Sequence, residues 1–234
     1  MYKMKVFFIP HAGSSAINYI KFKKQKSDII DIVPIELAGR GKRAKVDFYK
    51  DFKEAKDDMK NQITSLKTQG EKYSIFGHSM GGLLAFEVAH SLEVEGDKDL
   101  HRIFISGCSS PDSNNISSQL GNVKDEDFIK RIEKLGGIPQ EVYEYSEIMD
   151  SFLKVLRQDI RIYDEYRIFN INKTIDKDII LLAGTEDQLC KNNLLTWNKY
   201  TSKNFECNMF EGGHFYLNDY ISDIIGIIER AVQY

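Results

Sequence analysis

The pentapeptide Gly77–Gly81 (GHSMG) is the feature that most constrains the fold of this 234-residue chain. The apolar run Tyr73–Phe76 before it predicts a strand, and the pattern of Gly81–Leu92 after it predicts a helix. A serine at so sharp a strand-to-helix turn adopts a strained backbone conformation, and side chains at the two flanking positions would clash. The sequence therefore predicts a turn that presents the Ser79 hydroxyl at the edge of a sheet.

Strands and helices alternate along most of the chain. Besides the two elements around the pentapeptide, the periodicity predicts strands over Lys5–Ile9, Asp31–Leu37, Arg102–Ser106, Asp178–Ala183 and Phe205–Phe210, and helices over Tyr49–Leu66 and Ile221–Val232. This alternation favours an α/β fold, with a mostly parallel sheet covered by helices on both faces.

The stretch from about 112 to 172 breaks the alternation. It begins with the Ser/Asn-rich segment Asp112–Ser118 and continues as charged, helical sequence over Asp125–Leu135 and Val142–Tyr166, with no convincing strand. A long helical insertion between two strands usually covers one end of a sheet. We therefore expect a single domain over residues 1–234, with a lid insertion over about 112–172.

Composition excludes several classes of protein. A net charge of -3 gives no reason to expect nucleic-acid binding through bulk electrostatics. The three cysteines, Cys108, Cys190 and Cys207, form neither a disulfide framework nor a zinc-ligand spacing. No apolar run is long enough to cross a bilayer. We expect a soluble, cytoplasmic protein that needs no metal or redox cofactor.

A serine hydroxyl is a weak nucleophile and needs a general base. His214 is the best candidate, since it follows the last predicted strand, and Gly212 and Gly213 allow its loop to bend toward Ser79. The orienting acid should follow the preceding strand, where Asp187 has the longer reach and Glu186 is the alternative. The sequence thus predicts a Ser79, Asp187 and His214 triad.

Hydrolysis through an acyl-serine also needs two backbone N–H donors for the developing oxyanion. One is the N–H of Met80, directly after the predicted nucleophile. The other should come from the loop after an early strand, and Ala12 in Pro10–Ser14 is our candidate. His11 and His78 flank these loops and are expected to pack beside the cleft rather than to transfer protons.

Several motifs together resemble the type II (discrete, editing) thioesterases of nonribosomal peptide and polyketide synthesis. They are Ile9–Gly13, Leu37–Gly41, Gly77–Gly82 and Gly212–Phe215, joined in the insertion by Asp125–Phe128 and Leu135–Pro139. The resemblance covers nearly the whole chain in the family's order. Ser14 replaces the glycine and Ala38 the proline that the family usually has, which concerns loop geometry rather than chemistry.

The resemblance implies an α/β-hydrolase fold with a helical lid, a triad at Ser79, Asp187 and His214, and oxyanion donors at Ala12 and Met80. It also implies a substrate held as a thioester on the phosphopantetheine arm of an acyl or peptidyl carrier protein. Such an enzyme clears stalled or mis-primed acyl groups, uses no cofactor of its own and works as a monomer. Neither nucleic acid nor membrane is expected as a partner.

Other functions are compatible with the same predicted residues. A general carboxylesterase or an acyltransferase would use the same triad, because the fold alone does not select the acyl substrate. A non-catalytic module that binds carrier proteins is a further alternative, and the intact triad argues against it.

Carrier proteins are generally acidic around the modified serine, so a basic docking patch is expected. Arg40, Lys42 and Arg43 form one candidate patch, and the lysines of Lys21–Lys26 form another. A solvated charged face is the commoner explanation for either set.

Overall fold

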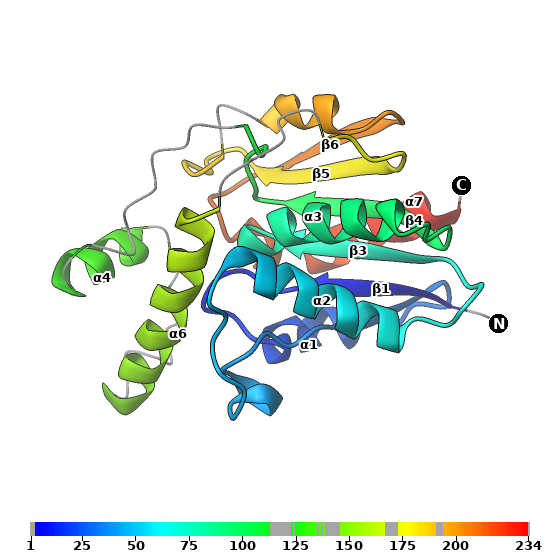
Figure 1. Cartoon of the computed structure of the whole chain (residues 1–234). Helices are drawn as coiled ribbons and strands as arrows, with labels where there is room; N and C mark the ends of the chain where they lie inside the picture. The colour runs from blue at the N-terminus through cyan, green and yellow to red at the C-terminus, as the bar shows by residue number, and fades with distance from the viewer. Residues whose placement is uncertain are drawn as a thin grey trace.

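The computed structural model describes residues 3–112, 123, 125–134, 136, 138, 146–166, 173–190 and 194–233. A six-stranded sheet runs through it in the order β2-β1-β3-β4-β5-β6 (Figure 1). The strands are β1 (Met4–Ile9), β2 (Ile30–Pro34), β3 (Tyr73–His78), β4 (Leu100–Ser106), β5 (Asp178–Gly184) and β6 (Phe205–Phe210). All five pairings between these strands are parallel.

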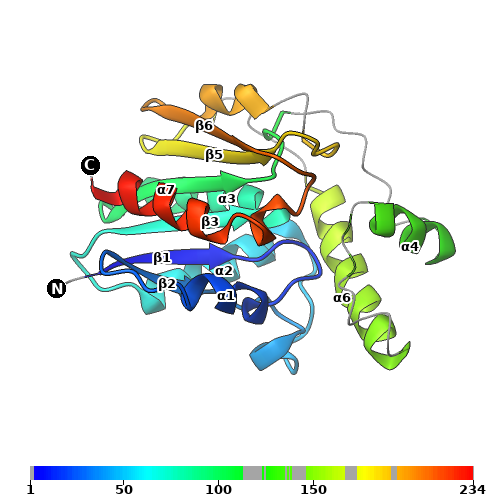
Figure 2. The same cartoon turned by 180° about the vertical axis from the view of Figure 1, so that it is seen from behind.

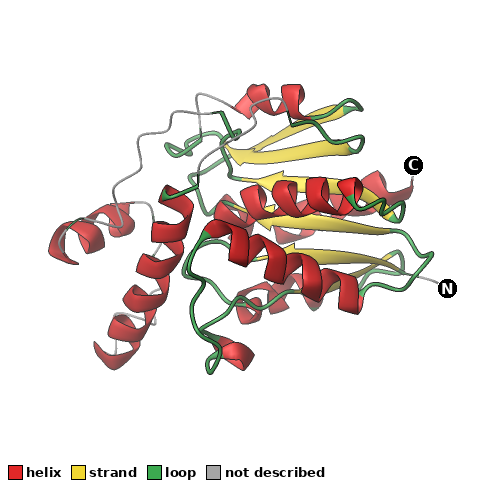
Figure 3. Ribbon diagram, in the orientation of Figure 1, coloured by secondary structure: helices red, strands yellow, loops and turns green. Residues whose placement is uncertain are grey.

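Helices cover both faces of the sheet, as Figures 2 and 3 show. Helices α2 (Phe52–Leu66) and α3 (Met80–Val94) pack on one face, and α1 (Ile20–Lys23) and α7 (Ile221–Gln233) pack on the other. The expectation of an α/β fold with a mostly parallel, doubly covered sheet is confirmed.

Strand β3 lies inside the sheet, and all six of its residues are buried. Its side chains alternate between the faces, because successive Cβ atoms of a strand point in opposite directions. Ile75 joins the core under α2 and α3, whereas Phe76 joins the core under α1 and α7 and stacks on Phe8 at a centroid distance of 4.3 Å. Burial on both faces explains why these strands are continuous apolar runs in the sequence.

Helix α2 begins three residues later than the apolar periodicity predicts. Asp51 caps it, since its side chain accepts a hydrogen bond from the Glu54 N–H at 2.7 Å. The buried side chains of the helix follow the spacing of one helical face and are Phe52, Ala55, Met59 and Ile63.

Strand β2 ends at Pro34 rather than at the predicted Leu37. Beyond Pro34 the chain turns toward the loop after β1. There the Glu36 carboxylate accepts hydrogen bonds from Ser15 Oγ at 2.8 Å and Ala16 N at 3.0 Å. A tertiary contact therefore replaces the strand pairing that local sequence favours.

The insertion between β4 and β5 contains α4 (Asp125–Lys134) and α6 (Ser146–Asp164). Both helices lie beyond the edge of the sheet toward which the strands point (Figure 1). They share a small apolar core that includes Phe128, Ile132 and Leu156. Predictions for Ser113–Ser118, Leu135 and Val142–Tyr145 fall outside the described residues.

The described residues on either side of 167–172 are both fixed to α3. The Tyr166 hydroxyl donates to Glu87 Oε1 at 2.6 Å, and Lys173 Nζ donates to Glu87 Oε2 at 2.9 Å. Glu87 is buried, so these bonds replace the water that its carboxylate loses on folding.

No helix among the described residues combines the length and apolar character that crossing a membrane requires.

Truncating the buried face of α2 should destabilise the fold. Met59 is fully buried, and Met59→Ala should lower the free energy of unfolding by about 2–5 kcal/mol through lost burial and a cavity. Leu66→Ala on the same helix is the matched control, because Leu66 is 45% exposed, and it should cost well under half as much. Urea unfolding measures both values. Equal losses would contradict the assigned packing.

Candidate active site

Ser79 occupies the turn between β3 and α3 with φ 55° and ψ -120°. It is the one non-glycine residue with positive φ in the described part of the chain. Such backbone strain costs on the order of 1–3 kcal/mol and persists where the surroundings over-determine it. Here the Ser79 N–H donates to Ser106 O at 2.8 Å, and the Gly82 N–H donates to Ser79 O at 2.8 Å. The strained turn that the pentapeptide predicts is present.

The two glycines around Ser79 are required by the packing of backbone on backbone. A Cβ at Gly77 would lie 1.9 Å from Gly81 O, and a Cβ at Gly81 would lie 2.3 Å from Ile9 O. Neither neighbour is a side chain that could move aside. The second contact also shows that the end of β1 lies directly against the first turn of α3.

This close approach brings the two candidate oxyanion donors to one region of the sheet edge. Met80 is the first residue of α3, where backbone N–H groups have no partner one turn earlier in the helix. Ala12 lies in the loop that leads from β1 to the short helix η1 (Ala16–Tyr19). Strands β1 and β3 are neighbours, and the sheet order reverses between them. In open α/β sheets, ligands usually bind at the carboxyl ends of the strands where the strand order reverses.

The structure pairs His214 with Asp187. His214 Nδ1 lies 2.8 Å from Asp187 Oδ2, and both side chains are buried. Glu186, the alternative acid, is exposed. The two loops meet because a glycine ends β5: a Cβ at Gly184 would lie 2.3 Å from Gly213 O.

The protonation of this pair follows from its surroundings. Burial raises the pKa of Asp187, but hydrogen bonds from His214, Cys190 and the Leu189 N–H oppose it and leave the pKa below its ordinary value. A charged carboxylate accepts the Nδ1–H of His214, so the imidazole keeps its Nε2 lone pair to accept a proton. The pair can therefore act as an oriented general base.

His78 packs beside His214, and His11 packs against His78, in line with the packing role expected for both. The His78 and His214 rings are 4.9 Å apart between centroids. His78 Nδ1 lies 2.8 Å from Ser106 Oγ, which lies 2.7 Å from the Tyr216 hydroxyl. Burial lowers the pKa of His78 far below its ordinary value and that of His11 to about 4. Both rings are therefore neutral at neutral pH.

Arg40 is not a surface residue, so its assignment to a docking patch was wrong. It is only 6% exposed, and its guanidinium binds the Asp159 carboxylate with two hydrogen bonds of 2.5 and 2.6 Å. The cause is a buried carboxylate on α6, far away in the sequence, which needs a charged partner.

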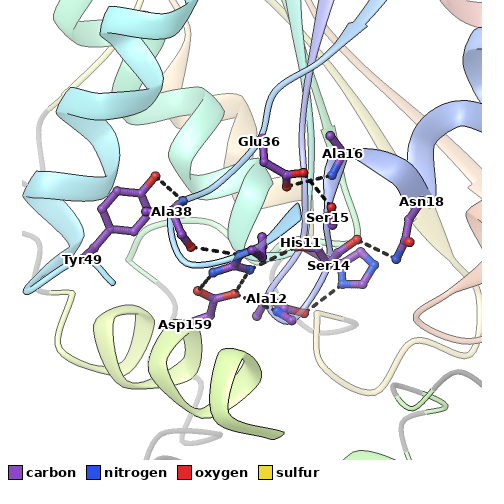
Figure 4. Close-up of polar contacts among 12 residues, drawn as sticks. His11, Ala12, Ser14, Ser15, Ala16, Asn18, Glu36, Ala38, Tyr49 and Asp159 are labelled. Carbon is purple, nitrogen blue, oxygen red and sulfur yellow. Dashed lines mark hydrogen bonds and ion pairs between the residues drawn. The ribbon is translucent and has the colours of Figure 1, made fainter. Parts of the chain in front are cut away.

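Asp159 also holds the loop that carries Ala12. Its Oδ2 accepts the Gly13 N–H at 2.8 Å, and Arg40 donates to Ser14 O at 3.1 Å. Figure 4 shows Asp159 facing this loop from α6. The insertion is thus joined by buried polar contacts to the loop that follows β1. No pattern in the sequence singles out Asp159.

The two departures from the family pattern both make hydrogen bonds (Figure 4). The Ser14 hydroxyl is buried and accepts from Asn18 Nδ2 at 3.0 Å. The Ala38 N–H donates to the Tyr49 hydroxyl at 3.0 Å, a bond that proline could not make because it has no N–H.

The other basic residues proposed for docking differ in their exposure and in their distance from Ser79. Arg43 pairs with Asp58, and Lys42 is exposed. Three lysines of Lys21–Lys26 line a surface pocket with Lys3 and Asp31, where β1 and β2 begin. That edge is opposite to the one that carries Ser79, so this cluster does not border the site.

The sequence does not reveal three polar partners of the site, namely Cys190, Ser106 and Tyr216. Cys190 Sγ lies 2.9 Å from Asp187 Oδ2. Its position three residues after Asp187 was the only available signal, and a lone cysteine there does not indicate a hydrogen bond. Within the described residues, no group of three or more His, Cys, Asp or Glu side chains could hold a metal ion.

The chain is similar to known thioesterases in both sequence and structure. Residues 4–232 match the family described as Thioesterase domain. ClbQ from the colibactin NRPS/PKS pathway superposes with a TM-score of 0.92 at 31% identity, covering 99% of this chain and 98% of ClbQ. BorB, the type II thioesterase from the borrelidin biosynthetic cluster, gives 0.87 at 26%, covering 98% and 92%. Linear gramicidin dehydrogenase LgrE of Brevibacillus parabrevis is 28% identical over 97% of this chain and 87% of its own.

Removing Asp159 should destabilise the protein strongly. Asp159→Ala leaves the buried Arg40 charge and the Gly13 N–H without their partner, which should lower the free energy of unfolding by about 3 kcal/mol or more. Glu165→Ala, which breaks the exposed pair with Arg161, is the control and should cost under about 1 kcal/mol. Denaturant unfolding compares them, and a loss for Asp159→Ala no larger than that of the control would refute the buried pair.

His11 should make stability depend on pH. Its pKa is about 4 in the folded protein and 6.5 ordinarily, so the unfolded chain takes up the proton first as the pH falls. The contribution of neutral His11 to the free energy of unfolding is therefore fully present above pH 6.5. It is lost as the pH falls toward 4. His11→Gln should show a smaller loss of stability between pH 7.5 and about 4.5 in urea titrations. An unchanged loss would show that His11 is not kept neutral by burial.

Proposed function

Because this chain belongs to the Thioesterase domain family, we propose that it hydrolyses acyl thioesters on the phosphopantetheine arm of carrier proteins in a nonribosomal peptide or polyketide synthase. The observation that carries the proposal is the buried His214–Asp187 pair at the sheet edge where β3 ends in the strained Ser79 turn. The likeness to ClbQ, which comes from an NRPS/PKS pathway, supports the carrier-bound substrate.

In the first half-reaction Ser79 Oγ attacks the thioester carbonyl carbon while His214 Nε2 takes the hydroxyl proton. The carbonyl oxygen becomes an oxyanion, which the N–H groups of Ala12 and Met80 stabilise. The intermediate then collapses, the C–S bond breaks, and the sulfur leaves with the proton from the imidazolium. Thiols of pKa about 8.5 are good leaving groups, so this step demands less of the acid than amide cleavage does.

In the second half-reaction water replaces the thiol. His214 Nε2 takes a proton from the water as its oxygen attacks the acyl-serine carbonyl carbon, and the same two N–H groups bind the second oxyanion. The Ser79 oxygen leaves with the proton from His214, which restores the free enzyme and releases the acid. Asp187 stays ionised throughout and stabilises the imidazolium in both halves.

Helices α4 and α6 act in this proposal as a lid, because they lie beyond the sheet edge that carries Ser79. Lys42 is the exposed residue of the first candidate patch that remains available to an acidic carrier protein. The protein would work in the cytoplasm as a monomer, and its triad requires no cofactor. Its described cysteines are free thiols, as a reducing compartment allows.

A general carboxylesterase and an acyltransferase are the competing enzymes, since the same triad can form the acyl-serine from an oxygen ester or pass the acyl group to an alcohol or amine. A non-catalytic binding module is the competing class. Their shared prediction is that hydrolysis of a carrier-bound thioester is absent or secondary.

The test compares three acetyl donors, namely acetyl-carrier protein, acetyl-CoA and p-nitrophenyl acetate. The wild type should hydrolyse the carrier-bound thioester with the highest kcat/KM, and Ser79→Ala should lower it by at least about 10³-fold, since it removes the nucleophile. Ser65→Ala, a serine truncation on an exposed part of α2, is the control and should change nothing.

Each competing enzyme has its own outcome. A faster reaction with the nitrophenyl ester and none with the carrier-bound group would replace the proposal by a carboxylesterase. Acetyl transfer to an added amine or alcohol in preference to water would replace it by an acyltransferase. Full activity in Ser79→Ala would remove the serine mechanism.

A further inference from the structure

The carboxylate of Asp187 has a third hydrogen-bond donor that the triad does not include. Its Oδ1 accepts the Leu189 N–H at 2.9 Å, and its Oδ2 accepts His214 Nδ1–H at 2.8 Å. Cys190 Sγ lies 2.9 Å from the same Oδ2. Cys190 follows Asp187 by three residues in the loop after β5, so the thiol and the carboxylate belong to one turn of chain.

The thiol is the donor in this contact. Cys190 is 1% exposed, and burial raises its pKa, as does the negative charge of Asp187. The sulfur therefore keeps its proton at neutral pH, and the charged carboxylate can only accept. A thiol held in this state is also a poor nucleophile, because the thiolate is the reactive form. Cys190 is thus unsuited to replace Ser79 and is placed to act on Asp187.

We propose that Cys190 is a positioning residue for the general base, whose S–H fixes the Asp187 carboxylate and shares the oxygen that holds His214. The inference rests on the proposed function in one respect, namely that His214 is the base. The cysteine acts on His214 only through Asp187.

The chemical consequence concerns the basicity of the pair. A hydrogen bond from the thiol to Oδ2 stabilises the negative charge there, so less of that charge is available to stabilise the imidazolium of His214. Removing the S–H should therefore make His214 hold its catalytic proton more tightly. The acid limb of the activity profile, which reports protonation of the essential base, should move to higher pH.

The other titratable groups around the His214–Asp187 pair do not produce the acid limb of the activity profile. His78 packs against His214 and His11 against His78, and burial lowers the pKa of both, to about 4 for His11. Cys108 and Tyr216 lie near Asp187, and burial raises the pKa of both. All four are therefore uncharged around neutral pH, and they remain in place when Cys190 is changed.

The test measures kcat/KM for acetyl-CoA from about pH 5 to 9 in the wild type, Cys190→Ala, Cys190→Ser and Cys108→Ala. Cys190→Ala should move the acid limb up by about half a pH unit, which lowers kcat/KM about threefold on the limb. Cys190→Ser keeps an O–H donor and should restore the wild-type limb. Cys108→Ala is the matched control, since it truncates a buried thiol that donates to Ser109 O and not to the triad.

A purely structural cysteine predicts a different result. Cys190→Ala would then lower activity or thermal stability at all pH values alike, or match Cys108→Ala, and the proposal would be overturned.

A second readout does not depend on turnover. The low-field proton NMR signal of His214 Nδ1–H, identified by its loss in His214→Ala, should move further downfield in Cys190→Ala and not in Cys190→Ser or Cys108→Ala. An unmoved signal would overturn the inference about Cys190. A wild type with no thioesterase activity would instead overturn the proposed function and leave this signal to decide the role of Cys190.

Discussion

The contact between the first turn of α3 and the end of β1 is the constraint on which the rest of the site depends. Only glycine at position 81 allows the two backbones to meet, since a Cβ there would lie 2.3 Å from Ile9 O. The contact brings the loop with Ala12 to the turn that exposes Ser79. The parallel sheet then adds the loops after β5 and β6, which carry Asp187 and His214 to the same edge.

Two buried carboxylates stabilise this arrangement from opposite sides. Asp187 fixes the imidazole of His214, and Asp159 fixes the loop after β1 together with Arg40. Each carboxylate accepts three hydrogen bonds, which offsets the cost of removing its charge from water. Asp159 belongs to the helical insertion, so the loop geometry depends on where α6 lies. This dependence joins the proposed lid to the proposed oxyanion donors.

The sequence predicts the elements that follow from local rules. The strained turn follows from glycines around Ser79, and the sheet follows from apolar runs between turn residues. Long-range polar contacts were not predictable: Arg40 reads as a surface cation because nothing near it reveals Asp159, 119 residues later. The predicted strand Asp31–Leu37 is longer than β2 for the same reason, since Glu36 forms hydrogen bonds with a distant loop. The contact of Cys190 with Asp187 was not predictable either, although the two residues are close in the sequence, because a single cysteine does not indicate its hydrogen-bond partner.

The activation of Ser79 by His214 is tested most directly by the site of covalent labelling by a fluorophosphonate, located by mass spectrometry of the digested protein. The reagent reacts with a serine hydroxyl only when a base activates it. If His214 activates Ser79, the wild type should give one labelled peptide, modified at Ser79, and His214→Ala should give no labelling within the same time. Labelling at another residue, or equal labelling of Ser79 without His214, would contradict it.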